Sequence, residues 1–204
     1  MNKIMSDYTA IYEAGESLTE LLRGEMSPEP IAKKEEIGLC EPQSPGDFRL
    51  TVWIYNIEEQ KDSGPLTGYI PDPADPAIER FAPMRLRLHA LISAHSKAAS
   101  AQKYSDEYRM IGRALQIIRD NPSIPAEYLR GTLAEQDEPV LLETVKLDAG
   151  QLSHIWNNTQ KTVCPSFGVD ISQVSICSDR IREIAPRVLV AEFNTSGKIS
   201  GKGR

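Results

Sequence analysis

Residues 84–95 read MRLRLHALISAH, and apolar and polar side chains alternate along most of the stretch. Because successive side chains of a strand point to opposite faces, this period of two predicts a β-strand with one face in the core. The side chains expected to point inward are Met84, Leu86, Leu88, Ala90 and Ile92. Those expected to point outward are Arg85, Arg87, His89 and Ser93.

The outward side chains of this strand have two interpretations. Arginine is enriched at protein interfaces, so Arg85, Arg87 and His89 are candidates for a contact with another subunit or a partner. The alternative is a face that solvent or a helix covers. The strand pattern alone leaves both open.

Two further elements are predicted on the N-terminal side. Residues 48–59, FRLTVWIYNIEE, alternate in the same way and predict a strand whose buried face includes Leu50 and Val52. Residues 7–24 carry apolar side chains at steps of three and four, from Tyr8 to Leu22, which predicts an amphipathic helix. Residues 58–83 contain five prolines and two glycines without a usable period. We expect there a long exposed loop that contacts a neighbour, with Tyr69 as a candidate contact residue.

A second helix is predicted directly after the central strand. Its expected buried stripe consists of Tyr104, Tyr108, Ile111, Leu115 and Ile118. Residues 105–107 would cap its start, and Asn121-Pro122 should end it, because proline pushes the preceding residue out of the helical region. Asp120 beside this stop is expected to bond backbone amides in a turn, and catalysis by its carboxylate is the weaker alternative.

The remaining elements are three strands and a short helix. Residues 139–147 form a strand candidate, and Asp148 with Gln151 forms a capping box that starts a helix. In residues 165–177 the apolar positions change from odd to even, which predicts a bulge near Ser172-Gln173. Residues 187–193, RVLVAEF, are a last strand that pairs with an edge in an adjacent subunit, with an arm of a partner protein, or with its own sheet. Its candidate contact residues are Arg187, Val188, Val190 and Phe193.

This order of elements predicts an α+β fold, with a mostly antiparallel or mixed β-sheet flanked by α-helices. We expect a single domain over residues 1–184, and a C-terminal strand with a flexible basic tail over residues 185–204.

The composition excludes several classes of protein. The 204 residues carry a net charge of -6, which argues against a nucleic-acid binder. No apolar run reaches the length of a membrane span and the start does not resemble a signal peptide, so we expect a cytoplasmic protein at synthesis. Three cysteines without a CxxC pair and three scattered histidines predict no metal site. No catalytic or cofactor motif occurs, so we expect neither an enzyme nor a cofactor.

Several segments together resemble a known family. They are IYNIEE at 54–59, the strand from Leu86 to His95, Gly112-Arg113-Ala114 with Asp120-Asn121-Pro122, and Leu152-Ser153 with Ile155-Trp156. In this order and spacing they resemble the cap, or tail-terminator, proteins of phage-tail-like contractile injection systems. The resemblance spans most of residues 7–178. The proline-rich stretch at 60–82 departs from the family pattern, and the resemblance fades after Cys177.

The resemblance implies a tail-terminator-like fold and a structural role without catalysis. Such a protein would form a homohexameric ring on the end of the particle distal to the baseplate. There it would end the growth of inner tube and sheath and hold the last sheath layer extended. Its partners would be its own copies, the inner tube protein and the sheath protein, and the particle would be extracellular if it is released. The alternatives are another adaptor of the same particle, on the baseplate side, and a small-molecule enzyme whose site no motif reveals.

Overall fold

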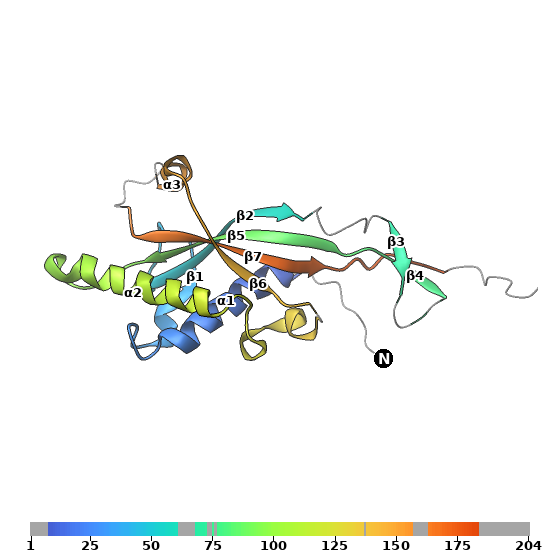
Figure 1. The fold of residues 1–204 in the computed structure, drawn as a ribbon, viewed down its shortest axis with the longest axis horizontal. Helices are drawn as coiled ribbons and strands as arrows, with labels where there is room; N and C mark the ends of the chain where they lie inside the picture. The colour runs from blue at the N-terminus through green and yellow to red at the C-terminus, as the bar shows by residue number, and fades with distance from the viewer. Residues whose placement is uncertain are drawn as a thin grey trace, which may run out of the picture.

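A five-stranded sheet in the order β1-β2-β5-β7-β6 forms the centre of the molecule in the computed structural model (Figure 1). The structure describes residues 8–60, 68–72, 75, 77–136, 138–156 and 163–183. The strands of this body sheet are β1 (Ile37–Leu39), β2 (Leu50–Glu59), β5 (Met84–Ala94), β6 (Leu141–Val145) and β7 (Ser166–Ile176). The helices are α1 (Ala10–Met26), α2 (Ser100–Asp120) and α3 (Ala149–Trp156), with short 3-10 turns at Lys34–Glu36, Ala126–Tyr128 and Gly131–Glu135.

The body sheet is mixed, as the sequence predicts. β5 lies at its centre and pairs antiparallel with β2 and β7, and β6 pairs antiparallel with β7. Only β1, which the sequence analysis did not predict, runs parallel to its neighbour β2. The fold is therefore α+β with helices flanking a mixed sheet.

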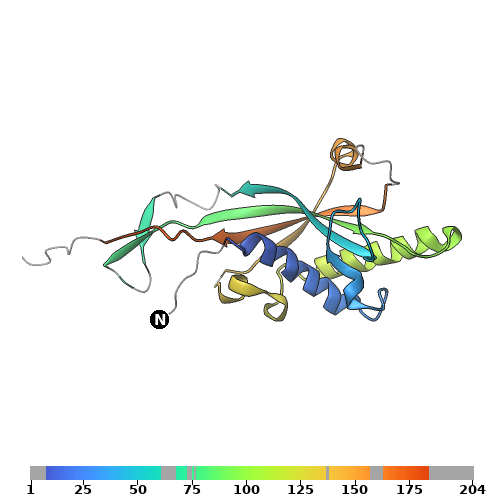
Figure 2. The same cartoon turned by 180° about the vertical axis from the view of Figure 1, so that it is seen from behind.

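The main core lies between this sheet and the helices α1 and α2, with α3 on the opposite side (Figures 1 and 2). Leu86, Leu88, Ala90 and Ile92 are buried as predicted. Met84, also expected inward, is 48% exposed because the end of β5 extends past the helical layer. Ser93, expected outward, is fully buried, and its hydroxyl lies 2.8 Å from Ser166 Oγ on β7.

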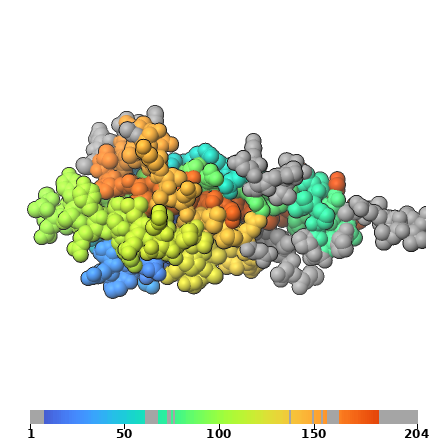
Figure 3. Space-filling view, viewed as in Figure 1, coloured from blue at the N-terminus to red at the C-terminus, as the bar shows by residue number. Residues whose placement is uncertain are grey.

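A second sheet projects from one end of the body, and we call it the arm (Figures 1 and 3). It consists of β3 (Tyr69–Pro71), β4 (Ile78–Phe81) and β8 (Ile181–Glu183), in the order β3-β4-β8. The prediction of one loop over residues 58–83 is therefore wrong. The strands are too short to show a period, and β4 also pairs with β8 about a hundred residues later, a partner that the local sequence does not reveal.

α2 is rotated relative to the predicted stripe. Its buried residues are Glu107, Met110, Ala114, Ile117 and Ile118, whereas Tyr104 and Tyr108 are 57% and 62% exposed. The helix also begins earlier than predicted, at Ser100, so residues 105–107 do not cap it. Its end is as predicted, but the side chain that bonds there is Asn121, whose Nδ2 donates to Ile117 O at 2.9 Å.

Two local predictions are confirmed at the other end of the chain. Register along β5 and β7 shifts by one residue beside Ser172, and Gln173 has a φ of 63°, so the predicted bulge is present. Asp148 and Gln151 form the capping box, with bonds of 3.0 and 2.8 Å in the two directions. Residues 187–193, predicted to be a strand, lie outside the described residues.

Candidate interaction surfaces

The predicted contact residues Arg85, Arg87 and His89 lie on one face of β5, the face away from α1 and α2. His89 Nδ1 lies 2.6 Å from Asp170 Oδ1 on β7, and His89 Nε2 lies 3.4 Å from Glu58 Oε2 on β2. Cross-strand pairing explains this proximity, because Asp170 stands opposite His89 in the register. The strand pleat brings the acids of two other strands to the basic side chains of β5.

The two arginines of this face differ in exposure. Arg87 is 43% exposed, and its Nε lies 3.9 Å from Asp170 Oδ2. Arg85 pairs with Glu138, and its buried Nε has no hydrogen-bond partner among the described residues. Arg87 therefore offers a charge at the surface, whereas the Nε of Arg85 is enclosed by its own chain.

Tyr55 completes this cluster on β2. Its ring centroid lies 6.1 Å from that of His89. Burial raises the pKa of the Tyr55 phenol, and the negative charges of Asp170 and Glu58 raise it further. The phenol therefore stays neutral and can act as a hydrogen-bond donor. Together these groups make a polar face suited to recognition of another surface.

The arm presents an aromatic and charged surface around Tyr69. The Tyr69 ring meets Phe81 edge to face with centroids 5.4 Å apart, and Arg182 Cζ lies 4.3 Å from the Tyr69 centroid. Arg182 also donates from Nε to Glu79 at 2.6 Å. Tyr69 was predicted as a contact residue from the sequence, but Phe81 and Arg182 were not. Phe81 reaches Tyr69 through the pairing of β3 with β4, and Arg182 reaches it through the pairing of β8 with β4.

The exposed half of the predicted α2 stripe forms a second surface, which we call the α2 stripe. It comprises Tyr104, Tyr108 and Leu115. The two tyrosine rings stack with centroids 6.4 Å apart. Gly112 lies between Tyr108 and Leu115, and a Cβ built there meets no atom of the described chain within 4 Å. A partner could therefore approach the helix backbone closely at this point.

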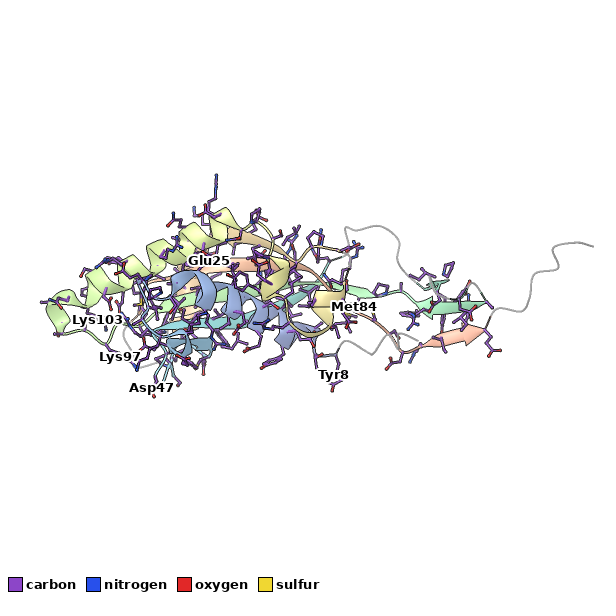
Figure 4. The ribbon with its side chains drawn as sticks, turned by 90° about the horizontal axis from the view of Figure 1, so that it is seen from below. Tyr8, Glu25, Asp47, Met84, Lys97 and Lys103 are labelled. Atoms are coloured by element: carbon purple, nitrogen blue, oxygen red, sulfur yellow. The ribbon has the colours of Figure 1, made fainter. Side chains whose placement is uncertain are left out.

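A third apolar group lies at the opposite end of the helical layer. Tyr8, Tyr12, Ile57 and Met84 are exposed, and Figure 4 shows Tyr8 and Met84 near the junction with the arm. Lys97 and Lys103, which flank the start of α2, lie at the far end of the body in the same view. The exposed tyrosines Tyr8 and Tyr12 are thus separate from Tyr104 and Tyr108, and the exposed Phe81 lies in the arm.

A charged hollow of about 670 Å³ lies beside the start of α2. Arg49 and Asp106 line it and pair at 2.6 Å, and Ser96 Oγ donates to the same carboxylate at 2.5 Å. Burial alone would raise the pKa of Asp106, but the bonds from Ser96 and Arg49 and the charge of Arg109 outweigh it and lower the pKa. The carboxylate therefore remains charged and holds Arg49 in place.

The described part of the chain contains no cluster of three His, Cys, Asp or Glu side chains that could hold a metal ion. Within the same residues, no helix is both long and apolar enough to cross a membrane.

Comparison with known families identifies the chain. The Pvc16 N-terminal domain matches residues 13–189, which is most of the length. The chain belongs to the Pvc16 N-terminal domain family. The predicted resemblance to the cap and terminator proteins of contractile injection systems is confirmed. Comparison with curated proteins found no match.

Two solved structures share the fold of this Pvc16 N-terminal domain. One is the sheath/tube terminator of PVC, an extracellular contractile injection system, in its extended state: 12% identity, TM-score 0.64, with 98% of this chain and 67% of that chain covered. The other is the tube-terminating cap of the anti-feeding prophage: 15% identity, TM-score 0.57, with 87% of this chain and 58% of that chain covered. At these identities the likeness shows the fold, which is tail-terminator-like as predicted.

Proposed function

We propose that this chain is the terminator of a contractile injection particle. It forms a homohexameric ring on the end distal to the baseplate, ends the growth of the inner tube and sheath, and holds the last sheath layer extended. Membership of the Pvc16 N-terminal domain family over residues 13–189 carries this proposal. The fold it shares with a sheath/tube terminator and a tube-terminating cap supports it. The chain is made in the cytoplasm and then becomes part of the particle, with a structural role and no reaction of its own.

The α2 stripe supports ring formation. Tyrosine side chains supply large contact areas at low entropic cost, and Tyr104 and Tyr108 are already stacked in the free chain. A ring with a head-to-tail interface needs a contact surface of this kind on one flank of every subunit. We assign the α2 stripe to the contact between neighbouring subunits.

The arm and the polar face of β5 support contacts with tube and sheath. The arm projects from the body, so the Tyr69 surface can reach a neighbouring ring (Figure 1). Arg85, Arg87 and His89 lie on the sheet face that α1 and α2 leave uncovered. We assign both surfaces to contacts with tube or sheath protein, and residues 185–204 to an extension of the single domain that makes further contacts.

The test is imaging of particles made with and without this chain. We expect that particles lacking it have tubes and sheaths of uncontrolled length, and that labelled chain lies at the end distal to the baseplate. A label at the baseplate end would replace the proposal with the adaptor alternative. Particles of normal length without the chain would contradict a terminating role.

A pair of variants tests the ring contact itself. Replacement of Tyr104 and Tyr108 by serine should abolish the hexamer in sedimentation experiments without lowering the melting temperature, because both side chains are exposed. Ile181→Ser is the matched control, since Ile181 is an exposed apolar residue in the arm. A hexamer that survives the tyrosine replacements would exclude the α2 stripe as the subunit contact.

A further inference from the structure

The outer edge of β2 is open over most of its length. β1 pairs only with Leu50, Thr51 and Val52, and Cys40 N donates to Val52 O at 3.0 Å where β1 ends. From residue 53 to 59, no strand of the described chain lies on this side of β2. In an antiparallel pair every second residue directs its N–H and C=O groups away from the partner strand. Alternate residues on either side of the β-bulge at Tyr55 therefore present backbone groups that no strand of the described chain pairs.

The other strand edges of the described chain are shorter or better covered. Beside β6, Leu142 N donates to Pro122 O at 2.8 Å and Ile124 N donates to Val140 O at 2.9 Å. The two edge strands of the arm have three residues each. Proteins usually cover or shorten strand edges, because an open edge pairs with other chains. The β2 edge is long and uncovered, so it is a candidate binding site for a strand of another chain.

Apolar side chains flank this edge on the helix side. A Cβ on Gly15 of α1 would meet Ile54 Cδ1 at 3.2 Å, so this face of α1 lies against β2. Tyr12 continues the same helix face towards the start of α1, three residues before Gly15, and Tyr8 lies in the turn just before the helix. They therefore lie beside the part of β2 that follows Ile54, where Ile57 is also exposed. An added strand could cover all three side chains.

We propose that the β2 edge binds residues 187–193 of a second copy of this chain as an added antiparallel strand. The segment RVLVAEF has the alternation and the β-branched residues of a strand. Charge also matches: the open edge ends in Glu58 and Glu59, and residues 184–204 carry four basic side chains and one acidic one. Strand addition gives main-chain affinity without a pocket, and the exposed tyrosines supply apolar contact.

The position of the arm requires that the strand comes from another copy. Glu59 pairs with Leu86, which stands opposite Val174, and Glu183 follows Val174 by nine residues. At about 3.3 Å per residue, Glu183 lies roughly 30 Å beyond the end of the β2 edge. The four steps from Glu183 to Arg187 span at most about 15 Å. An added antiparallel strand on this edge would need its residue 187 beside Glu59, which is out of reach within one chain, so the strand must come from another copy.

This contact deepens the proposed function and rests on it in one respect, that copies of the chain meet in a ring. Disulfide trapping tests it directly, because a disulfide forms only between Cβ atoms about 4 Å apart. One copy carries Glu58→Cys and a differently tagged copy carries Val188→Cys, two positions that stand opposite each other when residues 187–193 pair antiparallel with residues 53–59. The two are mixed, oxidised mildly and separated under non-reducing conditions, both as purified chain and in assembled particles. Copies with the native cysteines alone give the background.

We expect a disulfide between the two tagged copies in about tenfold higher yield than with Thr144→Cys, the matched control on the β6 edge. If Glu58→Cys has a lowered melting temperature, Asn56→Cys in one copy and Val190→Cys in the other test the same register. A link of equal yield to Thr144→Cys, or no link in either preparation, would overturn the proposal. So would a link within one chain that carries both substitutions. If no link forms but the chain still caps particles, the strand contact is wrong and the proposed function stands. If the link forms but the chain does not cap particles, the proposed function is wrong and the strand contact stands.

Discussion

The body sheet and the arm are stabilised by different kinds of interaction. β5 and β7 of the body have 11 residues each and place side chains such as Leu88 and Ile171 fully out of solvent. The arm strands have three or four residues, and none of their residues is buried. Across the arm the contacts are instead ionic and aromatic, as in the pair of Arg80 with Asp72.

The difference shows which part of the chain provides stability. Burial of a leucine side chain is worth about 1.5–3 kcal/mol, whereas a cross-strand polar or aromatic pair is worth about 0.2–1 kcal/mol. The arm should therefore open locally at a cost well below that of global unfolding. A segment of this kind can adapt to the surface of a partner, while the body keeps its shape.

The largest expected effect is a cavity in the body. Leu88→Ala should lower the free energy of unfolding by about 2–5 kcal/mol, because Leu88 is fully buried at the centre of β5. The matched arm substitution, Ile181→Ala, should change it by less than about 0.5 kcal/mol, because Ile181 is exposed. Chemical denaturation measures both. Equal losses would show that the two sheets unfold as one unit.

The next effect tests how closely the loops of the body are packed. Gly131 has a φ of 58°, and a Cβ there would overlap the Glu13 carboxylate. That carboxylate accepts bonds from Thr132 N at 2.9 Å and Thr132 Oγ1 at 2.6 Å. Gly131→Ala should therefore lower the free energy of unfolding by about 2–3 kcal/mol, which thermal or chemical denaturation measures.

Gly46→Ala separates backbone strain from overlap in this experiment. Gly46 has a nearly identical φ of 56° but no atom within 4 Å of a built Cβ. Gly46→Ala should therefore lower the free energy of unfolding by only about 1 kcal/mol. If both variants lose the same amount, the contact of Gly131 with Glu13 contributes nothing.

A smaller and local effect is expected in the arm. Arg80 donates from Nε and Nη2 to Asp72 Oδ2 at 3.0 and 2.6 Å, and Asp72 is nearly buried. Asp72→Asn should speed amide exchange in β3, β4 and β8 by roughly tenfold, equivalent to about 1.4 kcal/mol of local opening. Exchange in β5 should stay unchanged. Glu79, which pairs with Arg182, is more exposed than Asp72. Glu79→Gln should therefore speed amide exchange in the arm by less than Asp72→Asn does.

The smallest effect is a gain in stability at the α2 stripe. Gly112 lies in open space inside a helix, so Gly112→Ala should stabilise the isolated chain by up to about 1 kcal/mol. The same methyl group should weaken the hexamer if a neighbouring subunit packs against Gly112. Melting and sedimentation measure the two quantities separately. A variant that melts lower than the wild-type chain would mean that Gly112 serves the fold of the single chain.

The sequence by itself determined the features whose causes lie within a few residues. The alternation of residues 84–95 predicts β5 and places Arg85, Arg87 and His89 on one face. The change of parity near Ser172 predicts the bulge, and Asn121-Pro122 predicts the end of α2. Backbone geometry and side-chain period are local properties, so they can be recognised without knowledge of the rest of the chain.

Only the tertiary structure decided which partners these elements have. α2 carries two adjacent apolar stripes, and packing against the sheet buries the one with Met110 and Ala114, which leaves Tyr104 and Tyr108 outside. Asp170 and Glu58 reach His89 only through strand pairing. The arm forms because β8 pairs with β4 across about a hundred residues. Such choices depend on contacts that are distant in sequence, and no local pattern records them.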